Sequence, residues 1–174
     1  MNAVNQIMEI MDNIDYGFKD IHGINLIHNK EVWDNDFNNF YYLQSPEELL
    51  ESKCGVCWDQ VELERYLFNK KNILCKSYFI FMKEEDMLPS HTFITYKNNN
   101  KYYWFEHSWN KYKGIHEYNN EQLLLQDIIN KFKEEHGNYK TYIYEYNTPL
   151  YHIKCNDFYK YIETQKYIDI NSNC

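Results

Sequence analysis

The chain is 174 residues long, 44% of its residues are hydrophobic, and 18 Lys and Arg against 26 Asp and Glu give a formal net charge of −8. This length suits one domain with its own hydrophobic core, so we expect residues 1–174 to form a single domain. The acidic balance argues against general binding to the phosphate backbone of a nucleic acid.

The N-terminal sequence and the cysteines indicate the cellular compartment of the protein. Residues 1–17 lack the basic start and apolar run of a secretory signal. No stretch approaches the roughly 18 apolar residues that a membrane-spanning helix needs. The sequence therefore predicts a cytoplasmic protein that does not associate with membranes. The cysteines are irregularly spaced, and in the cytosol we expect thiols unless they are catalytic or metal-bound: Cys54, Cys57, Cys75, Cys155 and Cys174.

The first third of the chain predicts helices. Apolar residues at helical spacing predict an amphipathic helix over 2–12. Scattered aromatic residues over 16–43 predict an irregular segment. Ser45, Pro46 and Glu48 have the pattern of a capping box with proline at the first helical position, which predicts a short helix ending near Ser52.

After a break at Cys54-Gly55, residues 56–69 predict a second, longer helix with acidic residues in its N-terminal half. The pattern then changes to that of strands, with runs of β-branched and aromatic residues. These runs lie at 77–82, 91–97, 101–107 and 141–146, and a helix is predicted at 121–135. Helices followed by an antiparallel sheet with an inserted helix predict an α+β fold.

The segment that is most informative about chemistry is KCGVCWDQ, residues 53–60. A cysteine in the first turn of a helix lies at the positive end of the helix dipole, which favours the nucleophilic thiolate. Free backbone N–H groups there can also hold a developing oxyanion. Gly55 lets the backbone turn sharply before the helix. We therefore interpret Cys57 as a nucleophile.

A nucleophilic thiolate usually has an imidazole beside it. His91 begins one predicted strand, and Glu106 ends the next strand across the turn at 98–100. Both should lie near the same end of the hairpin, where Glu106 can orient the His91 ring as in a nucleophile–base–orienter triad. His107 is the rival to Glu106, because neighbouring residues of a strand point to opposite faces.

These motifs resemble the transglutaminase-like branch of the papain-like superfamily. The resemblance covers roughly residues 44–110, through Gly55-Val56-Cys57-Trp58, then His91, then the EHSW segment at 106–109, and it is to bacterial transglutaminase-like proteins. It implies a helix that carries the nucleophile packed on an antiparallel sheet. Glu106 stands where this branch usually has Asp.

The resemblance also implies thiol-dependent acyl transfer or amide hydrolysis through a thioester on Cys57. The substrate would be a peptide, a protein or a small amide, attacked without a cofactor or a metal. Gln44 is a candidate oxyanion donor and Trp58 a candidate wall of the substrate channel. Asp59 and Gln60 are predicted to be cap and solvent-facing residues.

Three other interpretations remain open at this stage. Cys54 and Cys57 form a Cys-x-x-Cys, which suits thiol–disulfide exchange when it opens a helix in a βαβ unit. A zinc site would need two further ligands at tight spacing, which the sequence does not offer. A non-catalytic binding module could keep the same scaffold and the same residues.

Overall fold

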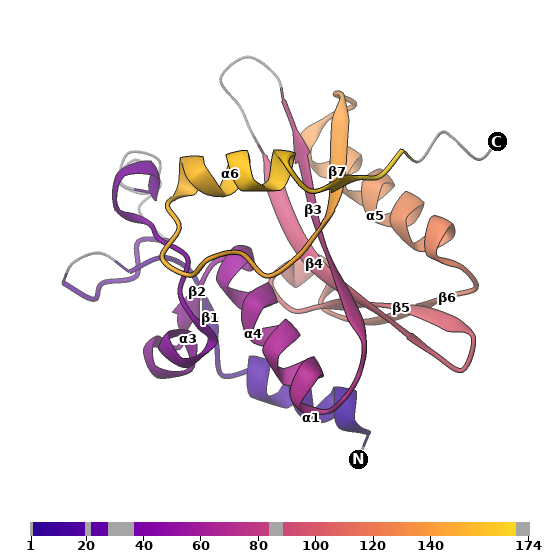
Figure 1. The fold of residues 1–174 in the computed structure, drawn as a ribbon, viewed down its shortest axis with the longest axis horizontal. Helices are drawn as coiled ribbons and strands as arrows, with labels where there is room; N and C mark the ends of the chain where they lie inside the picture. Colours follow the sequence, from indigo (N-terminus) through magenta and orange to yellow (C-terminus); the bar gives the residue numbers. More distant parts are fainter. Residues whose placement is uncertain (1, 20–21, 28–36, 84–88, 170–174) are drawn as a thin grey trace.

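The structure, a computed structural model, describes residues 2–19, 22–27, 37–83 and 89–169. Six strands form one antiparallel sheet in the order β6-β5-β4-β3-β7-β8, and β1 pairs in parallel with β2 outside this sheet (Figure 1). The strands are β1 (Asp15–Tyr16), β2 (Cys54–Gly55), β3 (Cys75–Met82), β4 (Ser90–Asn98), β5 (Lys101–Glu106), β6 (Gly114–Tyr118), β7 (Thr141–Tyr146) and β8 (Lys166–Tyr167).

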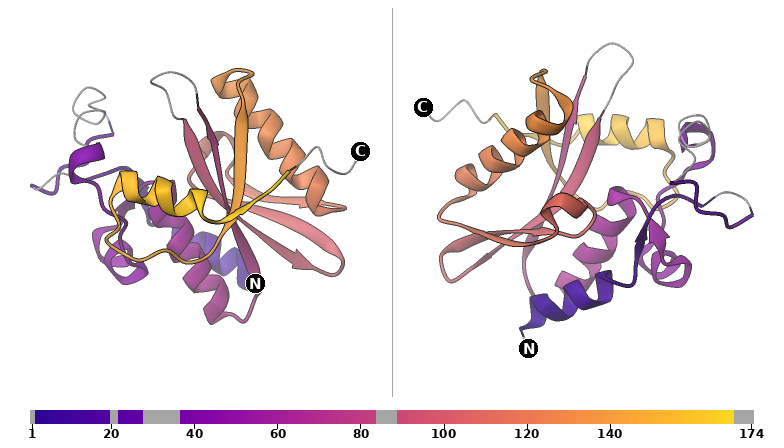
Figure 2. Two further views of the ribbon diagram at one scale, coloured as in Figure 1. Left: turned by 45° about the horizontal axis from the view of Figure 1, so that its top comes forward. Right: turned by 180° about the vertical axis from the view of Figure 1, so that it is seen from behind.

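Helices cover both faces of the sheet, so the predicted α+β class is confirmed. One apolar cluster joins α1, α3, α4 and α6 to one face of the sheet, and a second joins α5 to the opposite face (Figure 2). The helices are α1 (Ala3–Met11), α3 (Pro46–Ser52), α4 (Cys57–Lys70), α5 (Glu121–His136) and α6 (Cys155–Glu163), with a 3-10 turn η1 (Asn110–Tyr112) after β5.

Helix α3 begins where its cap predicts. The Ser45 hydroxyl accepts from the backbone N–H of Glu48 at 3.2 Å, and the Glu48 carboxylate accepts from the N–H of Ser45 at 2.7 Å. Pro46 occupies the first helical position. This capping box is confirmed, and Lys53, in the left-handed region with φ 52°, ends the helix just before β2.

Several elements differ from the sequence predictions. The prediction of an irregular segment over 16–43 is wrong where Asp15–Tyr16 pairs with β2, and residues 37–40 are helical. Residues 20–21 and 28–36 of that prediction lie outside the described residues. Strand β6 and helix α6 were not predicted. The apolar face of α6 could have been found, because Cys155, Phe158 and Ile162 recur at helical spacing and are buried.

Among the described residues, every helix is too short or too polar to cross a membrane.

Candidate active site

Cys57 occupies the first position of α4, and the residue is 5% exposed. The preceding residue, Val56, has no side chain that could accept a hydrogen bond, so the N–H groups of the first turn of α4 receive no bond from the N-cap side chain. Its backbone N–H groups consequently face the site with the positive end of the helix dipole. This start of the helix can hold both a thiolate and an oxyanion.

Gly55 precedes this turn for a steric reason. A Cβ atom at this position would lie 2.6 Å from Cδ1 of Leu49 and 2.8 Å from Cβ of Asp59. Only a residue without a side chain fits between α3 and the first turn of α4. Since Gly55 does not have positive φ, close packing, and not the sharp turn that we expected from the sequence, accounts for the glycine.

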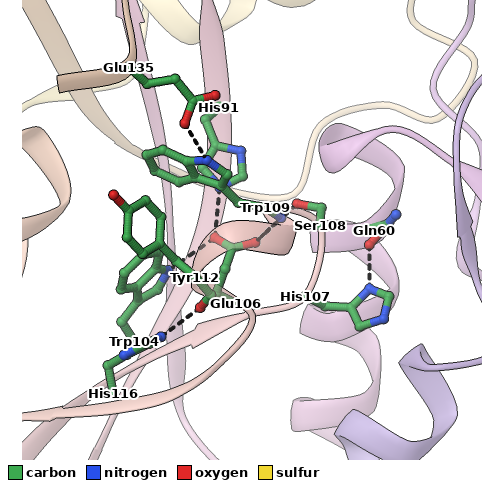
Figure 3. Close-up of polar contacts among 10 residues, drawn as sticks. All are labelled: Gln60, His91, Trp104, Glu106, His107, Ser108, Trp109, Tyr112, His116 and Glu135. Carbon is green, nitrogen blue, oxygen red and sulfur yellow. Dashed lines mark hydrogen bonds and ion pairs between the residues drawn. The ribbon is translucent and has the colours of Figure 1, made fainter. Parts of the chain in front are cut away.

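His91 and Glu106 meet across the β4–β5 hairpin. His91 Nε2 lies 2.7 Å from Glu106 Oε2, and both side chains are buried, with the residues 8% and 2% exposed (Figure 3). The carboxylate thus fixes the tilt of the ring and leaves Nδ1 as the nitrogen available to a further partner.

Cys57 is that further partner. Burial opposes a positive charge on His91, but the charge of Glu106 and hydrogen bonds with the Cys57 and Glu106 side chains raise the pKa of His91 to about 10. The imidazole is therefore charged at neutral pH, where it can stabilise a thiolate and later donate a proton. The structure thus brings Cys57, His91 and Glu106 together.

Three further donors fix the Glu106 carboxylate (Figure 3). Oε2 also accepts from Trp104 Nε1 at 3.2 Å, and Oε1 accepts from the Trp109 N–H at 2.7 Å and from Ser108 Oγ at 3.2 Å. Both oxygens of the carboxylate are thereby held in place. Ser108 and Trp109 thus bind the orienting group itself.

Trp109 also covers the His91 ring. The two rings pack edge to face with centroids 5.1 Å apart, and the indole Nε1 donates to Glu135 of α5 at 2.8 Å (Figure 3). One side chain therefore contacts the ring, while its backbone binds the carboxylate that holds the ring. Ring position and carboxylate position are coupled through Trp109.

Gln44 and Trp58, the predicted oxyanion donor and channel wall, have the following surroundings. Gln44 Nε2 donates to the Cys54 carbonyl at 3.0 Å, and its Oε1 accepts from Ser52 at 2.7 Å, so both ends of the amide are engaged. Trp58 is 3% exposed and packs among aromatic rings in the core beside α6. These rings are Phe37, Tyr41, Phe79, Phe158 and Tyr159.

The prediction that Asp59 and Gln60 face solvent is wrong, because both are buried. Asp59 does cap the helix: its carboxylate accepts from the N–H of Val56 at 2.9 Å. It also accepts from Tyr41 and from the N–H of Gln44, each at 2.9 Å. Burial raises the pKa of Asp59 to about 7, although these hydrogen bonds oppose the shift.

Gln60 connects the helix start to the segment after β5. Its Nε2 donates to the Gly55 carbonyl at 2.9 Å, and its Oε1 lies 2.7 Å from Nδ1 of His107 (Figure 3). An amide oxygen only accepts, so Nδ1 of His107 carries the proton. His107 therefore faces α4 while Glu106 faces His91, as the alternation of a strand requires.

The two cysteines of the Cys-x-x-Cys have different surroundings. Cys54 is a buried free thiol that lines a cavity of about 430 Å³ together with Lys19 and Tyr42. Burial raises the pKa of this thiol, which disfavours its thiolate. Cys57, three residues later at the start of α4, contacts His91 instead. Among the described residues no group of three or more His, Cys, Asp or Glu could hold a metal ion.

Sequence reasoning missed two groups near Cys57. The Tyr16 hydroxyl hydrogen-bonds the Cys57 side chain. Glu64, two turns along α4, is buried near Glu106, His91 and Cys57, and burial raises its pKa well above the usual value. Glu64 lies seven residues after Cys57, a spacing that places both on one helix face. For Tyr16 the sequence contains no comparable signal.

This arrangement, a cysteine at a helix start beside a histidine and an acid on adjacent antiparallel strands, defines a class of α+β proteins with a candidate cysteine nucleophile. A family model described as a transglutaminase-like domain matches residues 1–135 of the chain. The chain belongs to this transglutaminase-like family. A search of curated proteins found no match.

Proposed function

We propose that the protein catalyses acyl transfer or amide hydrolysis with a papain-like site in which Cys57 is the nucleophile, His91 the acid–base and Glu106 the orienting carboxylate. The observation that carries this proposal is the buried 2.7 Å contact between His91 and Glu106 beside the start of α4. The match to a family that is generally enzymatic supports it.

The first half-reaction follows from these positions. The Cys57 sulfur attacks the carbonyl carbon of an amide, a C–S bond forms, and the carbonyl electron pair moves to oxygen. Backbone N–H groups of the first turn of α4 stabilise that oxyanion. The C–N bond then breaks while charged His91 donates its proton to the leaving amine, which leaves a thioester on Cys57.

A second nucleophile completes the reaction. His91, now neutral, accepts a proton from water or from an amine as that nucleophile attacks the thioester. The C–S bond then breaks, and the electron pair returns to sulfur as the Cys57 thiolate. Water gives hydrolysis, and an amine gives transfer. The charge of Glu106 stabilises the imidazolium in both directions, which is the role of the acid in such triads.

The test uses an acyl donor that reports directly on thioester formation. With p-nitrophenyl acetate we expect a burst of nitrophenolate equal to the protein concentration, and acetylation at Cys57 by peptide mass spectrometry. Cys57→Ser should abolish the burst, whereas Cys75→Ser, a matched change at a cysteine in β3, should leave it intact. A burst that survives Cys57→Ser would refute the proposal.

Alkylation separates the competing functions. A free thiol, with a pKa of about 8.5, reacts slowly with iodoacetamide at pH 6, and we expect Cys57 to react there in a manner that depends on His91. If the protein were instead a thiol–disulfide oxidoreductase, Cys54→Ser and Cys57→Ser would reduce its disulfide-exchange activity equally. A binding module would show neither the burst nor the alkylation.

A further inference from the structure

The N-terminal segment reaches the start of α4 through the parallel β1–β2 pair. Asp15 N donates to the Lys53 carbonyl at 2.8 Å, and Gly17 N donates to the Gly55 carbonyl at 3.2 Å. The residue between them, Tyr16, lies opposite Gly55, two residues before Cys57. The chain therefore places a tyrosine beside the cysteine although 41 positions separate them in the sequence.

The segment that carries Tyr16 is held on both sides. Besides the two backbone bonds to β2, the Tyr16 carbonyl accepts from Nδ2 of Asn25 at 3.3 Å. A Cβ atom at Gly17 would lie 2.0 Å from Oδ1 of the same Asn25 side chain. Tyr16 is thus fixed relative to α4 before any substrate binds.

The Tyr16 hydroxyl contacts the reacting atom itself. Burial raises the pKa of Tyr16 well above its usual value, and the charge of Cys57, a hydrogen bond with its side chain, and the charges of Asp59 and Glu106 act in the same direction. The phenol is therefore protonated at neutral pH. A protonated phenol next to a thiolate is a hydrogen-bond donor.

Gln44, the residue that the sequence predicts as oxyanion donor, directs its side-chain amide to other partners. The Gln44 amide is occupied by Ser52 and by the Cys54 carbonyl. The hydroxyl of Tyr16 and the ring of His91 both contact the Cys57 side chain. Because His91 donates its proton to the leaving amine, we assign to Tyr16 the hydrogen bond to the carbonyl oxygen of the substrate.

We propose that Tyr16 is a further catalytic residue of this site, whose hydroxyl hydrogen-bonds the Cys57 sulfur at rest and the carbonyl oxygen of the substrate during attack. This inference rests on the proposed acyl-transfer function. As the C–S bond forms, negative charge leaves sulfur and appears on oxygen. The hydrogen bond of the phenol accordingly shifts from the sulfur to the oxygen. Tyr16 transfers no proton, so the step balances with His91 as the acid.

The test is Tyr16→Phe, which removes the hydroxyl and keeps the ring. With p-nitrophenyl acetate we expect kcat to fall by about 10²-fold or more, the usual effect of removing one oxyanion donor, while KM changes little. Alkylation of Cys57 at pH 6 should also slow, because the thiolate loses a donor. Tyr103→Phe, which removes a phenol bonded to Glu117 on the opposite end of β5, is the matched control.

A retained kcat in Tyr16→Phe would overturn the inference, provided that Cys57→Ser is inactive. If the wild-type protein itself gives no burst, the proposed function fails first. Should Tyr16→Phe not fold, 3-fluorotyrosine at position 16 gives the answer. Its more acidic phenol donates a stronger hydrogen bond, so alkylation of Cys57 at pH 6 should be faster than in the wild type, and an unchanged rate would refute the role.

Discussion

Gln60, in the first turn of α4, and His107, directly after β5, form a 2.7 Å hydrogen bond. The Gln60 side chain also donates to the Gly55 carbonyl. The helix that carries Cys57 is thereby joined to the strand that carries Glu106. This contact holds the nucleophile and the orienting acid at a fixed separation, although neither Gln60 nor His107 takes part in the proposed chemistry.

We predict that Gln60→Ala destabilises the protein by about 2–4 kcal/mol, because it leaves the Gly55 carbonyl and Nδ1 of His107 buried without partners. Urea unfolding measures this change. Gln126→Ala, at an exposed position of α5, should change stability little. In a double-mutant cycle with His107→Ala the two effects should not add, and additive effects would show that the two residues act independently.

Glu106→Gln should lower the rate of acyl transfer by about 10²- to 10⁴-fold, the range seen when the acid of a triad becomes an amide. It also removes the charge that raises the pKa of His91, so the imidazole should titrate at lower pH. NMR of labelled histidine follows this titration directly. Glu117→Gln, on β6, is the control and should leave both quantities unchanged.

Gly55→Ala should destabilise the fold by about 1–3 kcal/mol, as overpacking of a tight site does. The added methyl group meets Leu49 and Asp59. Adding Leu49→Ala to this variant should remove part of that repulsion, so the double variant should lose less stability than the sum of the single changes. Thermal unfolding of all three variants measures the coupling, and its absence would mean that the methyl group is accommodated by backbone movement.

Stability should fall as pH rises from about 4.5 to 7, in part because of Glu62. Burial raises the pKa of Glu62 to about 7, although Arg65 opposes the shift. A carboxyl group with a raised pKa binds its proton more tightly in the folded state than in the unfolded state. Its contribution to the free energy of unfolding is therefore complete below the unfolded-state pKa and is lost as the pH rises through the folded-state pKa.

Replacing this group tests the effect. Glu62→Gln should flatten the dependence of unfolding free energy on pH over this range, by up to about 3 kcal/mol. The exposed Glu134→Gln should leave the dependence unchanged. A Glu62→Gln protein that still loses stability as steeply as the wild type would show that other groups, such as Asp59, dominate.

Local signals account for what the sequence predicted well. The capping box at Ser45, the helix after Gly55 and the β4–β5 hairpin each depend on residues close in the chain, and each is confirmed. That His91 and Glu106 lie close together could be predicted from the hairpin, because the position of its turn determines which residues of the two strands lie at the same end.

Contacts between distant segments could not be predicted in this way. Tyr16 reaches Cys57 only through a two-residue parallel pair, which has no periodicity to detect. Gln60 appeared solvent-facing because its polarity suggested a surface, whereas its partners come from β2 and from beyond β5. The aromatic enclosure of Trp58 likewise depends on α6, which the predictions omitted.

The four donors around Glu106 have a consequence for the thermodynamics of turnover. When His91 gains or loses its proton, a carboxylate held by one partner would swing toward the new charge, and water would have to rearrange with it. Here Trp104, Ser108 and the Trp109 backbone restrain both oxygens. The dipoles that solvate the imidazolium are therefore already oriented in the resting protein, so the proton can move with little reorganisation energy.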